Sequence, residues 1–117
     1  MVLFFAALAD ETRLRLLNLM RDGEVCVCFF ADALATNDPK ISRHLAYLKR
    51  ARLVTARREG KWMHYQLARP VGEKAQEIFD NLMDLLTDDK EMQRDRDRLV
   101  KVCCTPVPVS IRRSANV

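Results

Sequence analysis

The order of hydrophobic and polar positions predicts a chain built mostly of helices. The apolar run at residues 2–9 predicts a short first helix. Asp10 offers a cap for a second helix, in which Leu14, Leu17 and Met20 recur at helical spacing on one face. The chain is therefore expected to open with a pair of amphipathic helices.

Two more helices are expected next, separated by a polar turn. Residues 24–28 form a short extended connector, and the apolar positions of the brief third helix after it are Phe29, Phe30, Ala33 and Leu34. The polar segment 36–38 ends this helix. Asp38 suits a capping position and Pro39 the first helical position, so a fourth helix is predicted from residue 39 to about residue 51.

The segment after the fourth helix has the pattern of a β-hairpin. Residues 53–58 and 62–67 are two strand-like runs, and the turn residues between them are Glu59, Gly60 and Lys61. Two short helices, a polar turn, a capped helix and a hairpin wing form the winged helix-turn-helix pattern. The predicted fold class is therefore mainly α with a β-hairpin wing.

An apolar stripe runs along the segment after the wing. Its members alternate four and three positions apart and are Val71, Ala75, Ile78, Leu82 and Leu85. Such a stripe suits packing against a partner helix, so we interpret it as a dimer seam. The pattern breaks near residue 87, and the charged run at residues 90–98 predicts a solvated helix. One domain is expected over residues 1–99, with a cysteine-bearing tail over residues 100–117.

Positive charge is concentrated in the middle of the chain. The net charge is only +4, but residues 39–69 carry one acidic residue, Glu59, and nine basic residues: Lys40, Arg43, Lys49, Arg50, Arg52, Arg57, Arg58, Lys61 and Arg69. A local excess of this kind suits a surface that neutralises DNA phosphates. A solvated charged face is the alternative interpretation.

The basic segment coincides with the helix and hairpin that read DNA in this fold. The second helix of a helix-turn-helix enters the major groove by its first residues, so base contacts are expected from Lys40, Ser42, Arg43 and His44. Positioning contacts to the DNA backbone are expected from the wing residues Arg57, Arg58 and Lys61. The expected partner is a double-stranded DNA operator.

Four cysteines are the candidate ligands for a small inducer: Cys26, Cys28, Cys103 and Cys104. The apolar start lacks the basic residues that precede an export signal, and no run approaches the length of a membrane span. A cytoplasmic protein is therefore expected, in which thiols bind metals or undergo redox chemistry more often than they form structural disulfides. Thiolates prefer soft ions. Small buried apolar residues are the alternative role for Cys26 and Cys28.

Four ordered segments resemble the ArsR/SmtB family of metal-responsive repressors, in its arsenic-sensing branch. These segments are residues 8–17, 24–28, 39–48 and 59–65. The resemblance implies a homodimer joined by its first and last helices, an imperfect palindromic operator, and release from DNA when the inducer binds. It implies no resident cofactor. The arsenic-sensing branch carries a thiol motif at Cys26 and Cys28, but a third cysteine that is common there is replaced by Ala31.

Because the third thiolate is missing, two arrangements of the inducer site are possible. Trivalent arsenic or antimony takes three thiolates, so Cys103 or Cys104 could complete a site with Cys26 and Cys28, within one chain or across the dimer. Alternatively, Cys103 and Cys104 alone could bind a trivalent organoarsenical, which needs only two sulfurs.

Three other functions compete with that of a metalloid-responsive repressor. A thiol oxidoreductase lacks support, because the chain has no Cys-x-x-Cys motif and only 3 glycines for a phosphate-binding loop, so no enzyme is expected. A redox-sensing repressor of the same fold and a Cd/Zn-sensing repressor stay open as alternatives.

Overall fold

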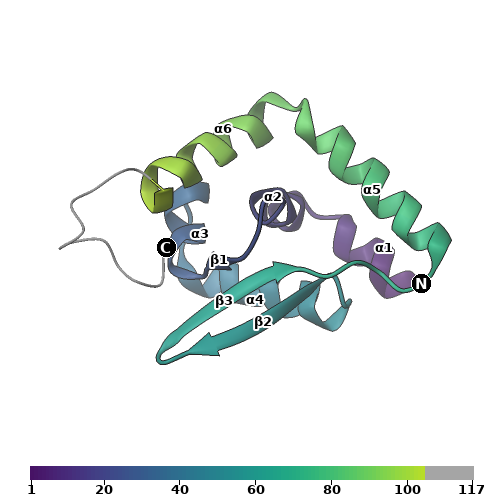
Figure 1. Cartoon of the computed structure of the whole chain (residues 1–117), viewed down its shortest axis with the longest axis horizontal. Helices are drawn as coiled ribbons and strands as arrows, with labels where there is room; N and C mark the ends of the chain where they lie inside the picture. Colours follow the sequence, from purple (N-terminus) through teal and green to yellow (C-terminus); the bar gives the residue numbers. More distant parts are fainter. Residues whose placement is uncertain (105–117) are drawn as a thin grey trace.

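The computed structural model describes the backbone of residues 1–104 and the side chains of residues 1–102 (Figure 1). In chain order, the elements are α1 (Val2–Leu8), α2 (Glu11–Leu19), β1 (Val25–Cys26), α3 (Cys28–Leu34), α4 (Asp38–Arg50), β2 (Val54–Glu59), β3 (Trp62–Leu67), α5 (Glu73–Thr87), α6 (Lys90–Leu99) and the π-helical turn η1 (Val100–Cys104). Within the described part, no helix is long and apolar enough to cross a membrane.

Helix caps determine where α2 and α4 begin. The Asp10 carboxylate accepts a hydrogen bond from the backbone N–H of Arg13 at 3.0 Å, which confirms the predicted cap of α2. The prediction for α4 was one residue late. Asn37 has extended backbone angles and accepts a hydrogen bond from the Lys40 N–H at 3.0 Å, so Asn37 is the cap and Asp38 is already helical.

The predicted wing is present, and the connector before α3 adds a third strand to it. The strands pair in the antiparallel order β1-β3-β2, and Glu59 faces Trp62 across the hairpin turn. Gly60 in that turn has a φ of 61°, a left-handed conformation that glycine adopts without strain. On the other edge, Cys26 pairs with His64. The short strand β1 therefore fixes the first cysteine to the base of the wing.

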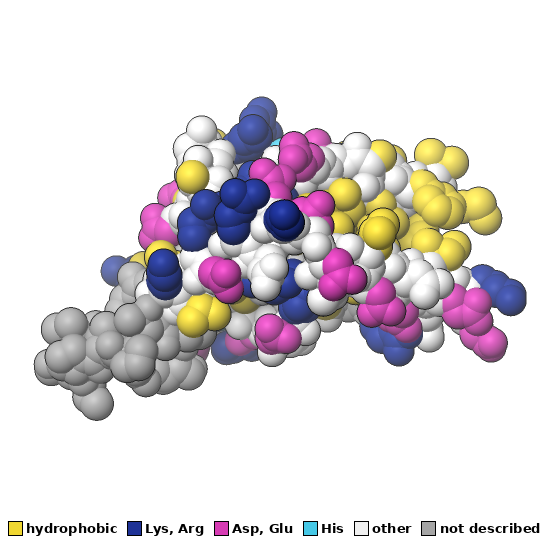
Figure 2. Space-filling view, turned by 90° about the horizontal axis from the view of Figure 1, so that it is seen from above, with side chains coloured by type: hydrophobic (Ala, Val, Ile, Leu, Met, Phe, Trp, Pro, Cys, Tyr) yellow, Lys and Arg dark blue, Asp and Glu magenta, His cyan; other side chains and the backbone are white. Residues whose placement is uncertain are grey.

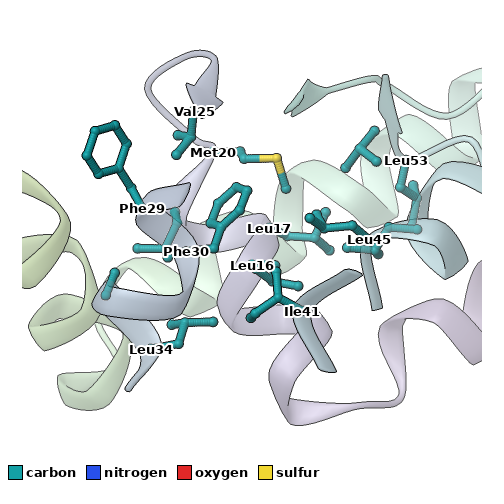
Figure 3. Packing of buried hydrophobic residues seen from close by; sticks show 14 of the residues in the cluster. Leu16, Leu17, Met20, Val25, Phe29, Phe30, Leu34, Ile41, Leu45 and Leu53 are labelled. Atoms are coloured by element: carbon teal, nitrogen blue, oxygen red, sulfur yellow. The ribbon is translucent and has the colours of Figure 1, made fainter. Parts of the chain in front are cut away.

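The core lies where α2, α3 and α4 meet (Figure 3). Leu16 and Leu17 of α2, Phe30 of α3, and Ile41 and Leu45 of α4 are all 1% exposed or less. Burying a large apolar side chain of this kind stabilises a fold by about 1.5–3 kcal/mol. The apolar face predicted for α4 is thus its core face, and its remaining faces are available for other contacts.

Helix α5 leaves much of its predicted apolar stripe in solvent. Phe79 and Leu86 are its buried contacts with the rest of the chain, whereas Val71, Ile78 and Leu85 are 86%, 42% and 72% exposed. Exposed apolar side chains of Met1 and of α1 join them: Met1, Val2, Leu3 and Phe5. Figure 2 shows hydrophobic side chains gathered at the end of the molecule where α1 and the start of α5 lie.

Helix α6 is docked on the fold, which corrects the prediction of a solvated helix. It packs on α2 and α3, and its side chains Met92 and Asp95 are buried. The charged sequence misled the prediction because α6 is held chiefly by ion pairs and hydrogen bonds, which leave no apolar stripe in the sequence.

Candidate DNA interface and thiol site

The first turn of α4 presents the predicted base-contacting residues. Lys40, Ser42 and Arg43 are exposed, while Ile41 and Leu45 of the same helix are buried in the core. The Asn37 cap fixes where the helix starts, and the apolar contacts fix its rotation. The outward face of α4 therefore carries two cations and a hydroxyl group at the end that a helix-turn-helix inserts into the major groove.

His44, also predicted to contact DNA, is turned back toward α2. Its side chain is 18% exposed, with Nδ1 3.2 Å from Nη1 of Arg13 and 3.6 Å from the Asp10 carboxylate. Arginine can only donate, so Nδ1 accepts and the neutral ring carries its proton on Nε2. Burial lowers the pKa of His44, and the positive charges of Arg13, Lys40 and Arg43 act in the same direction against the opposing effect of Asp10.

Arg13 connects the first helix to α4, a role that the sequence analysis missed. Its guanidinium donates to the carbonyl oxygens of Ala6 and Ala7 at 2.9 Å each, near the end of α1. The same group lies 4.1 Å from the centre of the Tyr47 ring on α4, a cation–π contact. No local pattern signals this role, because the partners of Arg13 come from two other helices.

The three wing cations occupy different environments. Arg57 makes two hydrogen bonds to Glu24 at 3.0 and 2.6 Å, and this bonding raises the pKa of Arg57. Arg58 donates to the Gly60 carbonyl at 3.1 Å, and Lys61 at the tip lies 5.5 Å from the Trp62 ring. All three are exposed. Arg57 must therefore divide its donors between Glu24 and any phosphate.

The predicted thiol pair is brought together at the start of α3. Cys26 ends β1 and is 3% exposed, and Cys28 is the first residue of α3. The Cys28 thiol donates a hydrogen bond to Sγ of Cys26 at 3.2 Å. Two thiolates that each lie about 2.3 Å from one tetrahedral ion are about 3.7 Å apart. A small side-chain rotation would thus let both sulfurs bind one soft ion.

The other two predicted ligands are only partly described. The backbone of Cys103 and Cys104 lies in η1, which packs against α3, but their side chains lie outside the described residues. Among the described side chains, no group of three or more His, Cys, Asp or Glu residues is arranged to hold a metal ion. Cys26 and Cys28 are therefore two candidate soft donors, without a third beside them in the part of the chain that the structure describes.

His64 beside the thiol strand is a second feature that the sequence analysis treated only as a strand residue. It is 3% exposed, and its Nε2 lies 3.3 Å from Glu59 without hydrogen-bond geometry. Its Nδ1 is 4.0 Å from Glu24. His64, Glu24 and Glu59 therefore form a compact group of ionisable side chains on the wing, next to Cys26.

Comparison with known proteins places this geometry in a family. Residues 10–56 match the family model described as bacterial regulatory protein, arsR family. A homodimeric winged helix-turn-helix domain of Mycobacterium bovis, titled a possible ArsR-family transcriptional regulator, is 33% identical. It aligns over 74% of this chain and 78% of its own, with a TM-score of 0.61. The chain belongs to the arsR family. The expected winged helix-turn-helix fold and the expected family of regulators, not enzymes, are thereby confirmed.

Curated arsR relatives include proteins named for arsenic. The arsenical resistance operon repressor of Escherichia coli is 47% identical over 77 residues, 65% of this chain and 66% of the relative. The arsenic resistance regulator ArsR1 of Pseudomonas putida is 42% identical over 81 residues, 68% and 63% of the two chains. The chain thus spans a little under two thirds of the length of these relatives.

A solved arsR-like structure is named for antimony. The AntR antimony-specific transcriptional repressor is 32% identical over 75% of this chain and 80% of its own, with a TM-score of 0.56.

Proposed function

We propose that the protein is a homodimeric repressor that leaves its DNA operator when trivalent arsenic or antimony, or a trivalent organoarsenical, binds its cysteine thiolates. The observation that carries this proposal is the thiol pair at the first residue of α3, because α3 directly precedes the exposed basic helix α4. A ligand held by these sulfurs acts on one half of the DNA-reading unit.

The DNA half of the proposal rests on α4 and the wing. Lys40, Ser42 and Arg43 are exposed at the start of α4 and would read base edges in the major groove. Arg58 and Lys61 at the wing tip would contact the backbone. His44 would contribute through its Nε2–H, since its Nδ1 is occupied by Arg13. Arg57 would join them only by sharing its bonds to Glu24.

The dimer half rests on the apolar surface of α1 and α5. A groove between these helices is lined by apolar side chains that include Phe4, Phe5, Val71, Ala75 and Ile78. A second copy would cover this surface, as befits a relative of the homodimeric Mycobacterium bovis protein. The dimer would present its two α4 helices about one DNA turn apart, roughly 34 Å, and so match a palindrome.

The inducer class follows from the donor set. Cys26 and Cys28 supply two soft sulfurs 3.2 Å apart, which suits a thiophilic ion and excludes hard ions such as Mg²⁺. Ala31 stands where the arsenic-sensing branch commonly has its third cysteine. We therefore assign the third thiolate to Cys103 or Cys104, whose backbone in η1 lies against α3. Names of relatives that refer to arsenic and antimony support the same class.

Release needs only a small change in the pair of α4 helices. Drawing Cys26, Cys28 and the tail onto one ion would shift α3 relative to β1, and α3 packs on α4. A coupling free energy of about 1–3 kcal/mol, typical of allosteric pairs, changes occupancy by roughly 5- to 150-fold. That range suffices to switch a gene.

The test is fluorescence anisotropy with a duplex that carries the palindrome upstream of the gene. Arsenite, antimonite, a trivalent methylated arsenical and Cd(II) are titrated into the complex. Salt-dependent binding and release by one of the trivalent species is the expected result. Failure to bind DNA contradicts the repressor proposal, and release by Cd(II) alone identifies the Cd/Zn-sensing alternative.

Substituted chains locate the thiolates. Cys103→Ser with Cys104→Ser should leave DNA binding unchanged and abolish release by arsenite. Adding Ala31→Cys to that variant should restore release, because residues 28 and 31 are neighbours on one helical face and would supply the missing sulfur. Retained release in the doubly substituted chain without Ala31→Cys contradicts the assignment of the third thiolate.

A redox-sensing repressor is the second candidate, favoured by the 3.2 Å separation of the two sulfurs. Peroxide would oxidise the two thiols to a disulfide and be reduced to two water molecules, with no metalloid required. Release by peroxide but by none of the four ions, with the loss of two titratable thiols per chain, would establish this function instead.

A further inference from the structure

Helix α6 is attached to the fold through one completely buried carboxylate. Asp95 is 0% exposed and lies between two arginines. Arg15 of α2 donates to it from Nε at 2.7 Å and from Nη2 at 2.8 Å, a two-point contact. Arg98, one turn further along α6, donates to it from Nη2 at 2.6 Å. The carboxylate thus joins α6 to α2 and orders an arginine of α6.

Arg98 continues this connection to α3. Its Nε donates to the backbone carbonyl of Ala33 at 2.8 Å, in the last turn of α3, where carbonyl oxygens have no partner inside the helix. The Arg98 side chain is 45% exposed, so its hydrogen bond to Asp95 is what holds its guanidinium against α3. Three helices therefore meet at the Asp95–Arg98 pair.

A separate set of hydrogen bonds, made by Met92 and Arg96, also secures α6. The Asn18 amide donates to the Met92 carbonyl at 2.9 Å, and Arg96 donates to the Asn18 oxygen at 2.6 Å. Arg96 also donates to the Thr87 carbonyl at 2.9 Å. Arg98 lies beyond these contacts, in the last turn of α6, which leads into η1.

The last turn of α6 determines where the tail cysteines lie. Cys103 follows Arg98 by five residues, which is about 7 Å of rise in a continuous helix. Over this distance η1 runs against α3, the helix that begins at Cys28. Loss of the bond between Arg98 and Ala33 would release the end of α6 from α3 while the Asn18 contacts keep its start in place.

We infer that Asp95 and Arg98 are positioning residues of the metalloid site: they hold the helix that carries the tail thiols against the helix that begins at Cys28. This inference rests on the proposed function, because it concerns a site shared by Cys28 and the tail. Neither residue contacts the metalloid. Their role is to reduce the motion that the tail thiols must lose when they bind.

Arg98→Gln is the variant that tests this role, with Arg94→Gln as its matched control. Both substitutions remove one positive charge from α6, but Arg94 is exposed and has no ion pair with another described residue. The Asp95–Arg15 contact stays in Arg98→Gln, so the fold and the DNA affinity without inducer should stay within about twofold of the original chain. DNA anisotropy checks both variants for folding.

The readout is the affinity for arsenite, measured by the absorbance of arsenic–thiolate bonds in the ultraviolet. Arg98→Gln should weaken binding by about 10-fold, the loss typical of a removed supporting partner in a metal site. Arg94→Gln should leave the affinity unchanged. Equal affinity in the two variants overturns the inference.

A second ligand separates positioning from general loosening of the fold. Phenylarsine oxide needs only two thiolates, so Cys26 and Cys28 can bind it in a chain with Cys103→Ser and Cys104→Ser. In that background Arg98→Gln should not change the affinity for phenylarsine oxide, and a 10-fold loss there would contradict a role through the tail. If the unsubstituted chain binds no arsenite at all, the proposed function fails before this inference is reached.

Discussion

Helices α5 and α6 follow each other in the chain, and their burial is the reverse of what their sequences suggest. Helix α5 has an apolar stripe, yet Ile78 and Leu85 on it are 42% and 72% exposed. Helix α6 is mostly charged, yet Asp95 at its centre is completely buried. Much of the apolar stripe of α5 has no partner inside the subunit, whereas the polar helix α6 is docked.

The difference lies in what each kind of contact requires. An apolar stripe is stabilised by any apolar surface that covers it, so a second copy of the chain can cover the stripe of α5. A buried carboxylate is stable only if specific donors surround it, so Asp95 depends on Arg15 and Arg98 in the same subunit. Exposed apolar surface here indicates association, whereas buried charge indicates fixed geometry.

The largest effect is expected from a charge on the stripe of α5. Ile78→Lys should convert the dimer to a monomer, because a second copy would have to bury an unpaired ammonium group. A monomer contacts one half-site, so operator affinity should fall by about 100-fold or more. Analytical ultracentrifugation and DNA anisotropy measure the two effects.

Glu77→Lys is the matched control for this prediction. Glu77 is the exposed neighbour of Ile78 on another face of α5, and its substitution also adds a lysine. It should stay dimeric and bind the operator at least as tightly. An Ile78→Lys chain that stays dimeric would contradict the assignment of the stripe as the dimer seam.

Removing the buried charge of α6 should cost stability and leave the oligomeric state unchanged. Asp95→Asn leaves Arg15 and Arg98 without their carboxylate and should lower the free energy of unfolding by about 2–4 kcal/mol. Asp97→Asn, two residues away and exposed, should lower it by less than about 0.5 kcal/mol. Urea unfolding compares them, and equal values would show that the buried pair contributes nothing to stability.

The contrast between α5 and α6 also explains which features of the structure could be predicted from the sequence. Elements that depend on local patterns were predicted: the cap Asp10, the core face of α4 and the glycine turn at Gly60. The start of α4 was one residue off because Asn37 and Asp38 both suit a capping position.

Contacts between distant residues escaped prediction. The partner of Asp95 is Arg15, 80 residues earlier in the chain, and nothing near either residue signals the pair. For the site, the sequence predicted the thiol pair and the basic start of α4. It did not predict that Arg13 binds His44 or that Glu24 binds Arg57, because these contacts exist only once the helices and the sheet are assembled.

A pH-dependent effect is expected at the polar contact between α2 and α4. The pKa of His44 is lowered in the folded chain, chiefly by burial. Below the ordinary histidine pKa of about 6.5, the unfolded chain therefore binds this proton more readily, and stability falls as the pH drops from 7 toward 5. The glutamine in His44→Gln can still accept a hydrogen bond from Arg13, but it does not titrate. The stability of this variant should therefore fall less as the pH drops. Urea unfolding at pH 7.5, 6.5 and 5.5 measures it, and identical slopes for both proteins would contradict the role of His44.

The smallest effect on stability is expected at Glu24. Its exposed ion pair with Arg57 should contribute less than the buried contact of Asp95. Hydrogen bonds from Arg57 lower the pKa of Glu24, so its contribution is present above the unfolded pKa of about 4.5 and is lost as the pH falls through the lower folded value. Because Arg57 is 52% exposed, Glu24→Gln should cost only about 0.2–1 kcal/mol at pH 7. Raising the salt concentration to 0.5 M should remove most of that difference and leave the cost of Asp95→Asn nearly unchanged, since buried pairs are screened far less. A salt-resistant cost for Glu24→Gln would mean that the wing is held by this pair as firmly as α6 is held by Asp95.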